Sequence, residues 1–594
     1  MAYRDDISAL NPDHHWPMDS GEASSASVSG NGSGYTVNDT LTVSGGTQTT
    51  AAQFNVDSIF SEAVSATVSA AGTGYAVSDQ LTLSGGTGTA AVFNVDSVGG
   101  SGEVTGVSLV TAGNYTIKPT DPVSTTGGTG TGCTLNITWQ DGNVNAVSLT
   151  TAGVYTDFPS NNVSTTGGTG SGCTLTVTWV IPDIIGTVDA TVVDGNNNAT
   201  LDGNPLTEDA SRNYLCNAAT DRLNIPSTTN INNSAQTRKA VAGWVEVSAI
   251  QLPPRTLYRE GTTGNYFQII MFAGNNVMFE VSNSAGINVQ AFSDNVFVAN
   301  RPYHVTAQIE GTGFGNFVRF YVDGILQSTT EPANGQLGAA SLNARGNAQV
   351  GDASGSTEIG QDAATLTGPI NGRYNHWATW DGANAALLSA TDIREELFEK
   401  GAVPGITITT DTQANMQIDL DTYADTLRGN EPLNIRVEDI TGGGDLTLTA
   451  DNITHDALAS IHVQWMGTGT LTWINSNGSD ASIASTPNSG TVVFEKPVTV
   501  SVTALDASDS SAISGARVLL EADSGGPLTA GTDIISDNTN GSGVASTTFN
   551  FVSNQPVTGK VRKGTASTYY KTSPIVGTIT ENGLSITTFL VPDE

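Results

Sequence analysis

The stretch DHHWPMD at residues 13–19 opens a domain that the chain completes only at DIIGT, residues 183–187. A repeat fills the gap between them. Four tyrosines recur at a spacing of 40 residues, each shortly after a glycine and each before a Gly-Gly-Thr turn: Tyr35, Tyr75, Tyr115 and Tyr155. We therefore predict one domain split into two pieces, with a four-fold repeat array inserted between them.

The composition indicates strands throughout. Glycine accounts for 67 of the 594 residues and charged residues for only 13%. Such usage, with Thr, Ser, Asn and Val between the glycines, is typical of short strands joined by tight turns. We predict an all-β, multidomain fold with several separate cores. The formal net charge of −35, with 22 basic residues, would repel a phosphate backbone, so we expect no nucleic acid as a partner.

No segment has the pattern of a targeting or membrane-spanning sequence. The first residues, MAYRDD, carry two acids and lead into no apolar run, unlike a secretory signal. No stretch offers the roughly 18 continuous apolar residues that a spanning helix needs, so we expect no membrane insertion. Three cysteines cannot form a disulfide framework. Cys133 and Cys173 occupy the same position in successive repeats, which predicts small buried residues.

Each repeat has the pattern of a few strands. In the first repeat Leu41 and Val43 alternate with polar residues before the Gly-Gly turn, and Phe54 and Val56 alternate after it, as strands do. Such a unit cannot bury an apolar face alone, so neighbouring units or copies from other chains must cover one another. The recurring tyrosines are candidate carbohydrate-stacking platforms, and a role in core packing explains their regularity as well.

From residue 183 to 403 strand-like runs follow one another at the spacing of a two-sheet sandwich, with a turn at Asp323-Gly324. One helix is expected near the end, at residues 392–400. Ser389 or Thr391 would cap its start and Gly401 would end it.

These pieces together resemble the concanavalin A-like, laminin-G-like jelly-roll family. The matching segments are residues 15–19, 303–306, 321–326, 372–380 and 388–393. The resemblance implies glycan or protein binding, often with calcium at one sandwich edge, where Asp352, Glu358 and Asn375 are the candidates. Because this chain has Asn375 where members commonly carry an acid, the calcium ligands are incomplete. We expect no cofactor, with calcium at this edge as the one candidate ion.

Some relatives with the same shell are glycosidases. They use a Glu-x-Asp-x-Glu or Glu-x-Asp-x-x-Glu strand, which places the nucleophile and the general acid on one face of the sheet. Nothing in the sandwich segment fits this motif, and the six histidines show no metal-ligand spacing. We therefore predict a protein that is not an enzyme and has no catalytic residues.

The last third also alternates as strands, and Lys496-Pro497 marks a boundary within it. The final hundred residues resemble a bacterial immunoglobulin-like domain, on the segments VTVSV at 498–502, SGARVLLE at 514–521 and NTNGSGVA at 538–545. The predicted domains are the first sandwich strand at 1–21, the repeat array at 22–180, the rest of the sandwich at 181–403, a β linker domain at 404–495 and the immunoglobulin-like domain at 496–594.

This combination of domains resembles bacteriophage virion proteins such as tail fibres, receptor-binding proteins and head fibres or decorations. It implies a virion protein that is assembled in the bacterial cytoplasm and released by lysis. Its expected partners are other virion proteins and a host-surface glycan, with a homo-oligomeric state that would be a trimer in a fibre. One alternative is a purely structural capsid or tail decoration that binds only virion proteins. Another is a secreted bacterial adhesin or polysaccharide hydrolase.

Overall fold

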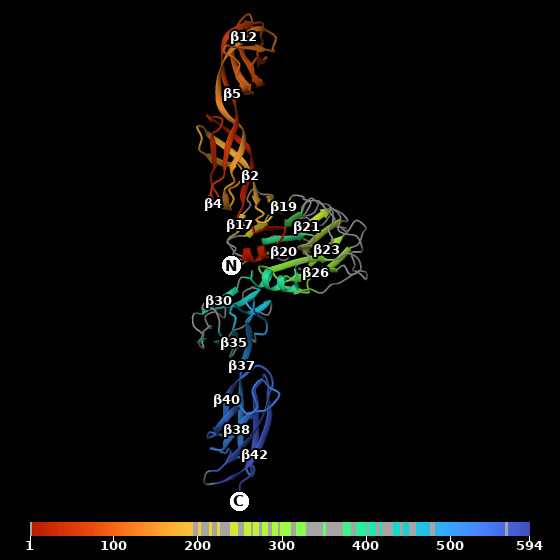
Figure 1. Ribbon diagram of the computed structural model, residues 1–594. Coiled ribbons are helices and arrows are strands. Elements are labelled where there is room, and N and C mark those ends of the chain that lie inside the picture. The colour runs from red at the N-terminus through yellow and green to blue at the C-terminus, as the bar shows by residue number, and fades with distance from the viewer. Residues whose placement is uncertain are drawn as a thin grey trace. The chain divides into compact units, whose positions relative to one another are not determined.

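The computed structural model describes most of the chain, and contacts divide it into two compact units, Met1–Gly401 and Ala402–Glu594. Each unit is considered by itself. The described residues are 3–193, 200–202, 213–216, 222–225, 238–247, 255–262, 265–271, 276–282, 288–294, 297–310, 317–327, 348–351, 372–381, 388–400, 402, 404–410, 416–417, 432–439, 444–450, 455, 459–475, 481–564 and 568–593. The fold is all-β, as predicted, with several sheets and short helices only (Figure 1).

The sandwich of the first unit has two antiparallel sheets. The first contains, in spatial order, β17 (Thr200–Asp202), β18 (Asn213–Cys216), β29 (Gly372–Asp381), β20 (Arg238–Val247), β25 (Pro302–Glu310), β26 (Phe317–Val322) and β27 (Ile325–Leu326). The second contains β16 (Ala190–Val193), β19 (Arg222–Ile225), β28 (Ala348–Gly351), β21 (Arg255–Thr262), β22 (Asn265–Met271), β23 (Val277–Ser282) and β24 (Asn288–Phe292). Trp16 and Trp377 are fully buried in the core that the two sheets share.

The two distant ends of the sandwich meet as the sequence predicted. Strand β1 (His14–Trp16) pairs with β29, and the Ile184 amide donates to the His15 carbonyl over 3.0 Å. The Asp183 carboxylate accepts hydrogen bonds from the backbone amides of His15 and Gly186 and lies 2.6 Å from His14 Nδ1. Burial raises the pKa of the Asp183 carboxyl, but these hydrogen bonds outweigh it and leave the pKa below its usual value.

Two short helices cover the outer face of the first sheet. The sequence predicted η2 (Asp392–Glu399), and Ser389 rather than Thr391 caps it: the Asp392 amide donates to Ser389 Oγ over 3.1 Å, and the Ser389 amide donates back to the Asp392 carboxylate over 2.7 Å. Helix α1 (Tyr3–Ala9) was not predicted. The Trp244 indole donates to Tyr3 Oη over 2.9 Å, which holds α1 against this sheet.

The inserted repeats, here called the repeat arm (residues 22–181), form two stacked tiers. Two strands of 21 residues, β5 (Gln53–Thr73) and β12 (Thr131–Thr151), run antiparallel through both tiers (Figure 1). The proximal tier adds β2 (Glu22–Ser33), β3 (Thr40–Val43), β4 (Thr47–Thr50), β13 (Val154–Asp157), β14 (Val163–Thr166) and β15 (Ser171–Ile181). The distal tier adds β6 (Gln80–Leu83), β7 (Thr87–Thr89), β8 (Val92–Val98), β9 (Val104–Thr111), β10 (Asn114–Ile117) and β11 (Val123–Thr126). The end of β15 pairs with β16, so the arm continues into the second sheet of the sandwich.

The repeats pair in a nested order within one chain. The first pairs with the fourth in the proximal tier, as β2 with β15 and β3 with β14, and the second pairs with the third in the distal tier. The distal tier has an apolar core of its own, whereas the core of the proximal tier is continuous with that of the sandwich. The sequence left open what covers each repeat, and the structure shows that it is another repeat of the same chain.

The second unit begins with a parallel two-sheet coil, a topology that the sequence did not predict. Successive strands alternate between the sheets, and each pairs in parallel with the strand one turn later. One sheet holds β30 (Pro404–Thr410), β32 (Leu433–Asp439), β34 (Ile461–Trp465) and β36 (Ala484–Ser485). The other holds β31 (Met416–Gln417), β33 (Leu446–Ala450), β35 (Thr470–Asn475) and the start of β37 (Thr491–Asp506).

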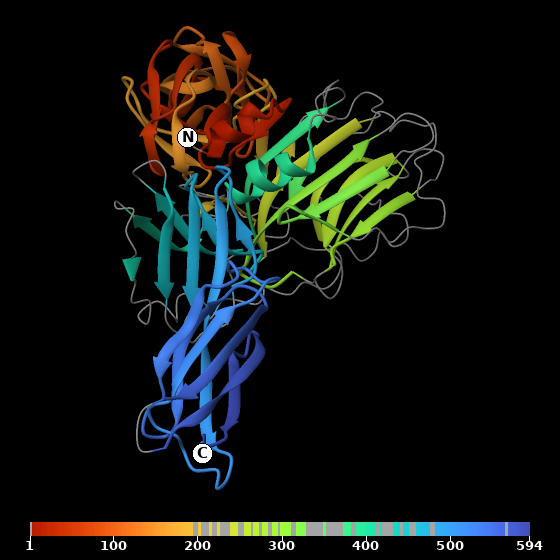
Figure 2. The same ribbon diagram turned by 60° about the horizontal axis from the view of Figure 1, so that its bottom comes forward.

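Strand β37 belongs to two domains at once. Its first half pairs with β35 of the coil, and its second half pairs with β40 (Val544–Phe551) and β43 (Leu584–Leu590) of the C-terminal domain (Figures 1 and 2). The expected boundary at Lys496-Pro497 therefore lies inside one continuous strand. A second sheet, of β38 (Arg517–Ala522), β39 (Asp533–Asn538), β41 (Gln555–Lys563) and β42 (Tyr570–Ile579), completes this domain around an apolar core.

Candidate functional site

The four repeated tyrosines are core residues, which corrects their assignment as stacking platforms. Tyr35, Tyr75, Tyr115 and Tyr155 are each at most 5% exposed. Each hydroxyl accepts a backbone hydrogen bond from the repeat it pairs with: Tyr35 from Cys173, Tyr75 from Cys133, Tyr115 from Ala91 and Tyr155 from Ala52. A ring closed off on both faces cannot stack on a sugar. The alternative role in core packing is the one the structure shows, and both cysteines are buried as predicted.

Of the three proposed ion ligands, Asn375 alone lies in the described part of the chain. Asn375 is fully buried on β29 opposite Trp244, and β29 is an inner strand of its sheet, so Asn375 is not a ligand at an open edge. Asp352 and Glu358 lie outside the described residues. Where the structure describes the chain, no group of three His, Cys, Asp or Glu side chains is placed to hold a metal ion. In the same part of the chain no helix has the length and apolar character to span a membrane.

The proximal tier contains an open slot between β2 and β12. Around this tier the strands pair in the order β2, β15, β14, β3, β5, β12, and β12 then lies beside β2 without a ladder between them. Backbone hydrogen bonds close this seam only at its ends. The Gly34 and Tyr35 amides donate to the carbonyls of Asp141 and Gly142 at one end, and the Ala23 amide donates to the Ala152 carbonyl at the other.

The slot has a volume of about 430 Å³, within the usual range for small-molecule sites. Its walls are Ala26, Ser27, Val28 and Asn31 of β2 and Val144, Asn145, Ala146 and Val147 of β12, with Phe60 of β5 and Asn114 of β10 at the junction between the tiers. Among the residues that the structure describes, the side chains of Asn31 and Asn114 form no hydrogen bond. Asn145 Nδ2 donates to Ser58 Oγ over 3.0 Å. The side-chain carbonyl oxygen of Asn145 can still accept a hydrogen bond from a ligand.

The sequence analysis did not identify the asparagines of the slot because it relied on the residues that all four repeats have in common. The signal was instead in where the repeats differ: Asn31 stands where the second repeat has Ala71, and Asn145 stands where the third has Thr105. Such differences at single exposed positions indicate a site only once the pairing of the repeats is known.

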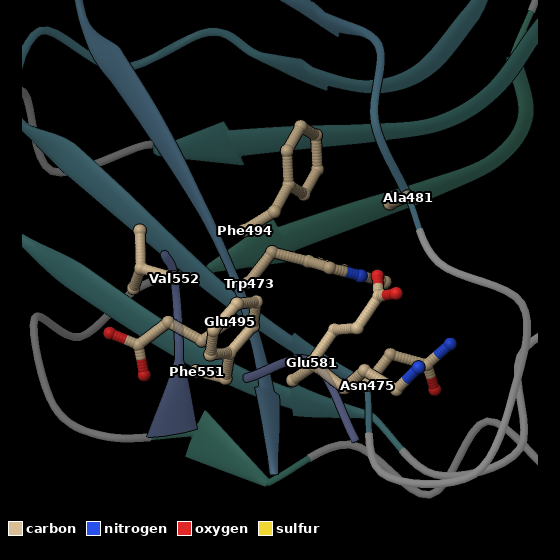
Figure 3. Close-up of a pocket in the computed structure, with 9 residues that line it drawn as sticks. Trp473, Asn475, Ala481, Phe494, Glu495, Phe551, Val552 and Glu581 are labelled. Carbon is tan, nitrogen blue, oxygen red and sulfur yellow. The ribbon is translucent and has the colours of Figure 1, made fainter. Parts of the chain in front are cut away.

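A smaller hollow lies in the second unit, where β37 passes from the coil into the C-terminal domain. It encloses about 170 Å³, and nine residues line it, among them Trp473, Phe494, Phe551 and Glu581 (Figure 3). Burial raises the pKa of another lining residue, Glu495. Its mixed aromatic and charged walls are less suited to a polar uncharged ligand than those of the larger slot.

Comparisons with known proteins add little. No protein-family model matches the chain, and no curated protein matches it. Among solved structures, the Botulinum neurotoxin serotype D binding domain is 12% identical with a TM-score of 0.26, over 36% of this chain and 48% of that one. The binding domain of Botulinum neurotoxin DC in complex with rat synaptotagmin II is 14% identical with a TM-score of 0.24, over 37% and 48%. The chain thus covers about half of these structures, and TM-scores this low carry no argument about function.

Proposed function

We propose that this chain is a non-enzymatic structural protein of a bacteriophage virion, exposed on the particle, that binds host-surface glycans through its repeat arm. The slot between β2 and β12 is the observation that carries the glycan part. The virion part is supported by the order of the domains in the sequence.

The chemistry of the slot suits a sugar. A sugar ring presents hydroxyls at its rim and C–H groups on its faces. The amides of Asn31 and Asn114 can each donate to and accept from hydroxyls, and the half-buried side chains of Val28 and Val147 offer an apolar surface for the C–H groups. One such site binds weakly, but many copies on one particle raise the overall avidity by orders of magnitude.

A deletion between two paired residues removes the arm, together with the part of the shared apolar core that the arm supplies. Glu22 and Val180 are register partners on β2 and β15, so a two-residue Asn-Gly turn between them can replace residues 23–179 and close a hairpin. We expect this armless variant to fold, because β1, β29 and the Asp183 hydrogen bonds lie outside the deletion. Circular dichroism and thermal unfolding check that it does.

Binding of purified protein to a panel of bacterial strains then tests the proposal. Full-length protein should be retained on cells of at least one strain, enzymatic removal of surface polysaccharide should abolish retention, and the folded armless variant should not be retained. If the full-length protein binds no strain but pulls down phage structural proteins, the purely structural decoration is correct. Release of reducing sugar from host polysaccharide would contradict the non-enzymatic role.

A further inference from the structure

The two tiers provide an internal comparison for the slot. The distal tier has an equivalent seam between β5 and β9, and it is closed in the same way. Gly74 and Tyr75 donate to the carbonyls of Ser101 and Gly102 at one end, and Ala63 donates to the carbonyl of Ala112 at the other. The backbone hydrogen bonds at the ends of the two seams are therefore equivalent. Any difference in ligand binding between the seams must come from their side chains.

The side chains differ at the positions that face the opening. Asn31, opposite Cys173 across the β2–β15 ladder, corresponds to Ala71, opposite Cys133. Forty residues separate Asn145 from Thr105 and Phe60 from Gly100 at matching places in the repeats. Only the proximal seam thus presents asparagine amides at these positions, while the strands that frame both seams are alike.

Charge restricts which sugars can approach. Residues 22–181 contain ten acidic residues and a single basic one, Lys118, whose ammonium group pairs with Asp141 at 2.8 Å. No charged side chain lines the slot. A carboxylate-, sulfate- or phosphate-bearing glycan would meet a uniformly negative arm and no cation to pair with, so repulsion would oppose its binding at low ionic strength.

We infer that the slot between β2 and β12 is a binding site for uncharged oligosaccharides, with the Asn31, Asn114 and Asn145 amides bonding the hydroxyls and the half-buried Val28 and Val147 contacting the C–H groups of one ring face. This inference rests on the proposed glycan-binding function and deepens it by naming the class of sugar and the site. It assigns no such role to the equivalent distal seam.

The experiment measures binding of three probes to the full-length protein by calorimetry and by NMR of the sugar: cellotetraose, triacetylchitotriose and trigalacturonate. At least one of the two neutral probes should bind, and trigalacturonate should not. Because no ion pair is formed, the affinity for the neutral probe should change little when NaCl rises from about 0.05 to about 0.5 M.

Variants locate the site. Asn31→Ala and Asn145→Thr give the slot the residues of the distal seam. Each should weaken neutral-probe binding about three- to tenfold, as expected for one lost hydrogen bond. Ala71→Asn, which adds an amide to the distal seam instead, is the matched control and should leave the affinity unchanged. Both slot residues are exposed, so these variants should fold; a Phe60 variant is avoided because that ring is only 5% exposed.

The outcomes distinguish a failure of the proposed oligosaccharide site from a failure of the proposed glycan-binding function. If trigalacturonate binds as well as the neutral probes, or if Asn31→Ala and Asn145→Thr bind like the parent protein, the inference is wrong while glycan adhesion by the arm stands. If the arm is needed for retention on cells yet neither neutral probe binds, the inference is again overturned. If the protein binds neither cells nor any probe, the proposed function itself fails.

Discussion

At the scale of single residues, the repeats interlock through one position that is either an acid or a proline. Asp39 Oδ2 accepts hydrogen bonds from the Thr169 amide and hydroxyl across the proximal tier, and Asp79 does the same with Thr129 in the distal tier. The third and fourth repeats have Pro119 and Pro159 there, each packed on the Gly-Gly turn of its partner repeat. Each pair of repeats is thus held together by hydrogen bonds to an aspartate at one end and by apolar packing of a proline at the other.

The Asp39 hydrogen bonds predict a pH dependence. Hydrogen bonds from the Thr36 and Thr169 amides and the Thr169 hydroxyl lower the pKa of Asp39 from 3.8 to about 2. Because the folded-state pKa is below the unfolded one, the stabilisation is complete above about pH 4 and disappears as the pH falls toward 2. Asp39→Asn should therefore lower the melting temperature of the arm by a few degrees near pH 6 and by less at pH 2. A difference that is independent of pH would contradict this account.

Residue chemistry alone could not assign the tyrosines. Their 40-residue spacing predicted a repeat correctly, but a regular aromatic residue fits a binding surface and a core equally well. The choice depends on which repeat covers which, and that is set by pairings between residues 24 to 138 positions apart, such as Tyr35 with Cys173. Asn375 was misplaced for a related reason: its strand lies inside the sheet and not at its edge.

At the scale of elements, the glycine turns that end each seam determine where the slot opens. Gly142 has φ +70°, and a Cβ added there would lie 2.5 Å from the backbone N and O atoms of Tyr35. Gly142→Ala should destabilise this end of the seam by about 1–3 kcal/mol and speed hydrogen exchange at Gly34 and Tyr35. Gly100→Ala is the control, because a Cβ at Gly100 meets nothing within 4 Å. Equal exchange rates in the two variants would refute the role of this turn.

Strand existence was predictable from the sequence, and strand direction was not. Alternation of apolar and polar residues identified most strands of the second unit. The alternating sequence pattern is the same, however, whether the neighbouring strand runs parallel or antiparallel. The parallel coil was therefore missed. Lys496-Pro497 looked like a boundary because proline cannot donate to a ladder, but Pro497 lies within β37 opposite Asn550. Helix α1 is too short for a periodic pattern to identify it.

At the scale of the whole molecule, the distal tier has a separate apolar core and should fold as its own unit, whereas the proximal core is continuous with the sandwich core. Phe93, Leu81 and Leu135 belong to the distal core, while Phe54 and Leu175 belong to the proximal one. The tiers share only the two long strands, which cross from one to the other near Phe60 and Asn143. These two residues are register partners, so the distal tier can be removed at one point in the chain.

Replacing residues 63–139 with a two-residue Asn-Gly turn between the register partners Glu62 and Gln140 should give a folded protein with half an arm, since the turn joins strands that are already paired and leaves Asp141 and Gly142 in place at the end of the seam. The variant keeps Asn31, Asn145 and Phe60 but loses Asn114. Neutral-oligosaccharide binding should therefore persist and weaken about three- to tenfold, the effect of one missing hydrogen bond. Far-ultraviolet circular dichroism checks the fold, and calorimetry measures the affinity. Complete loss of binding in a variant that is shown to be folded would mean that the distal tier carries the site, because the side chains kept in the slot would then be insufficient to hold a sugar.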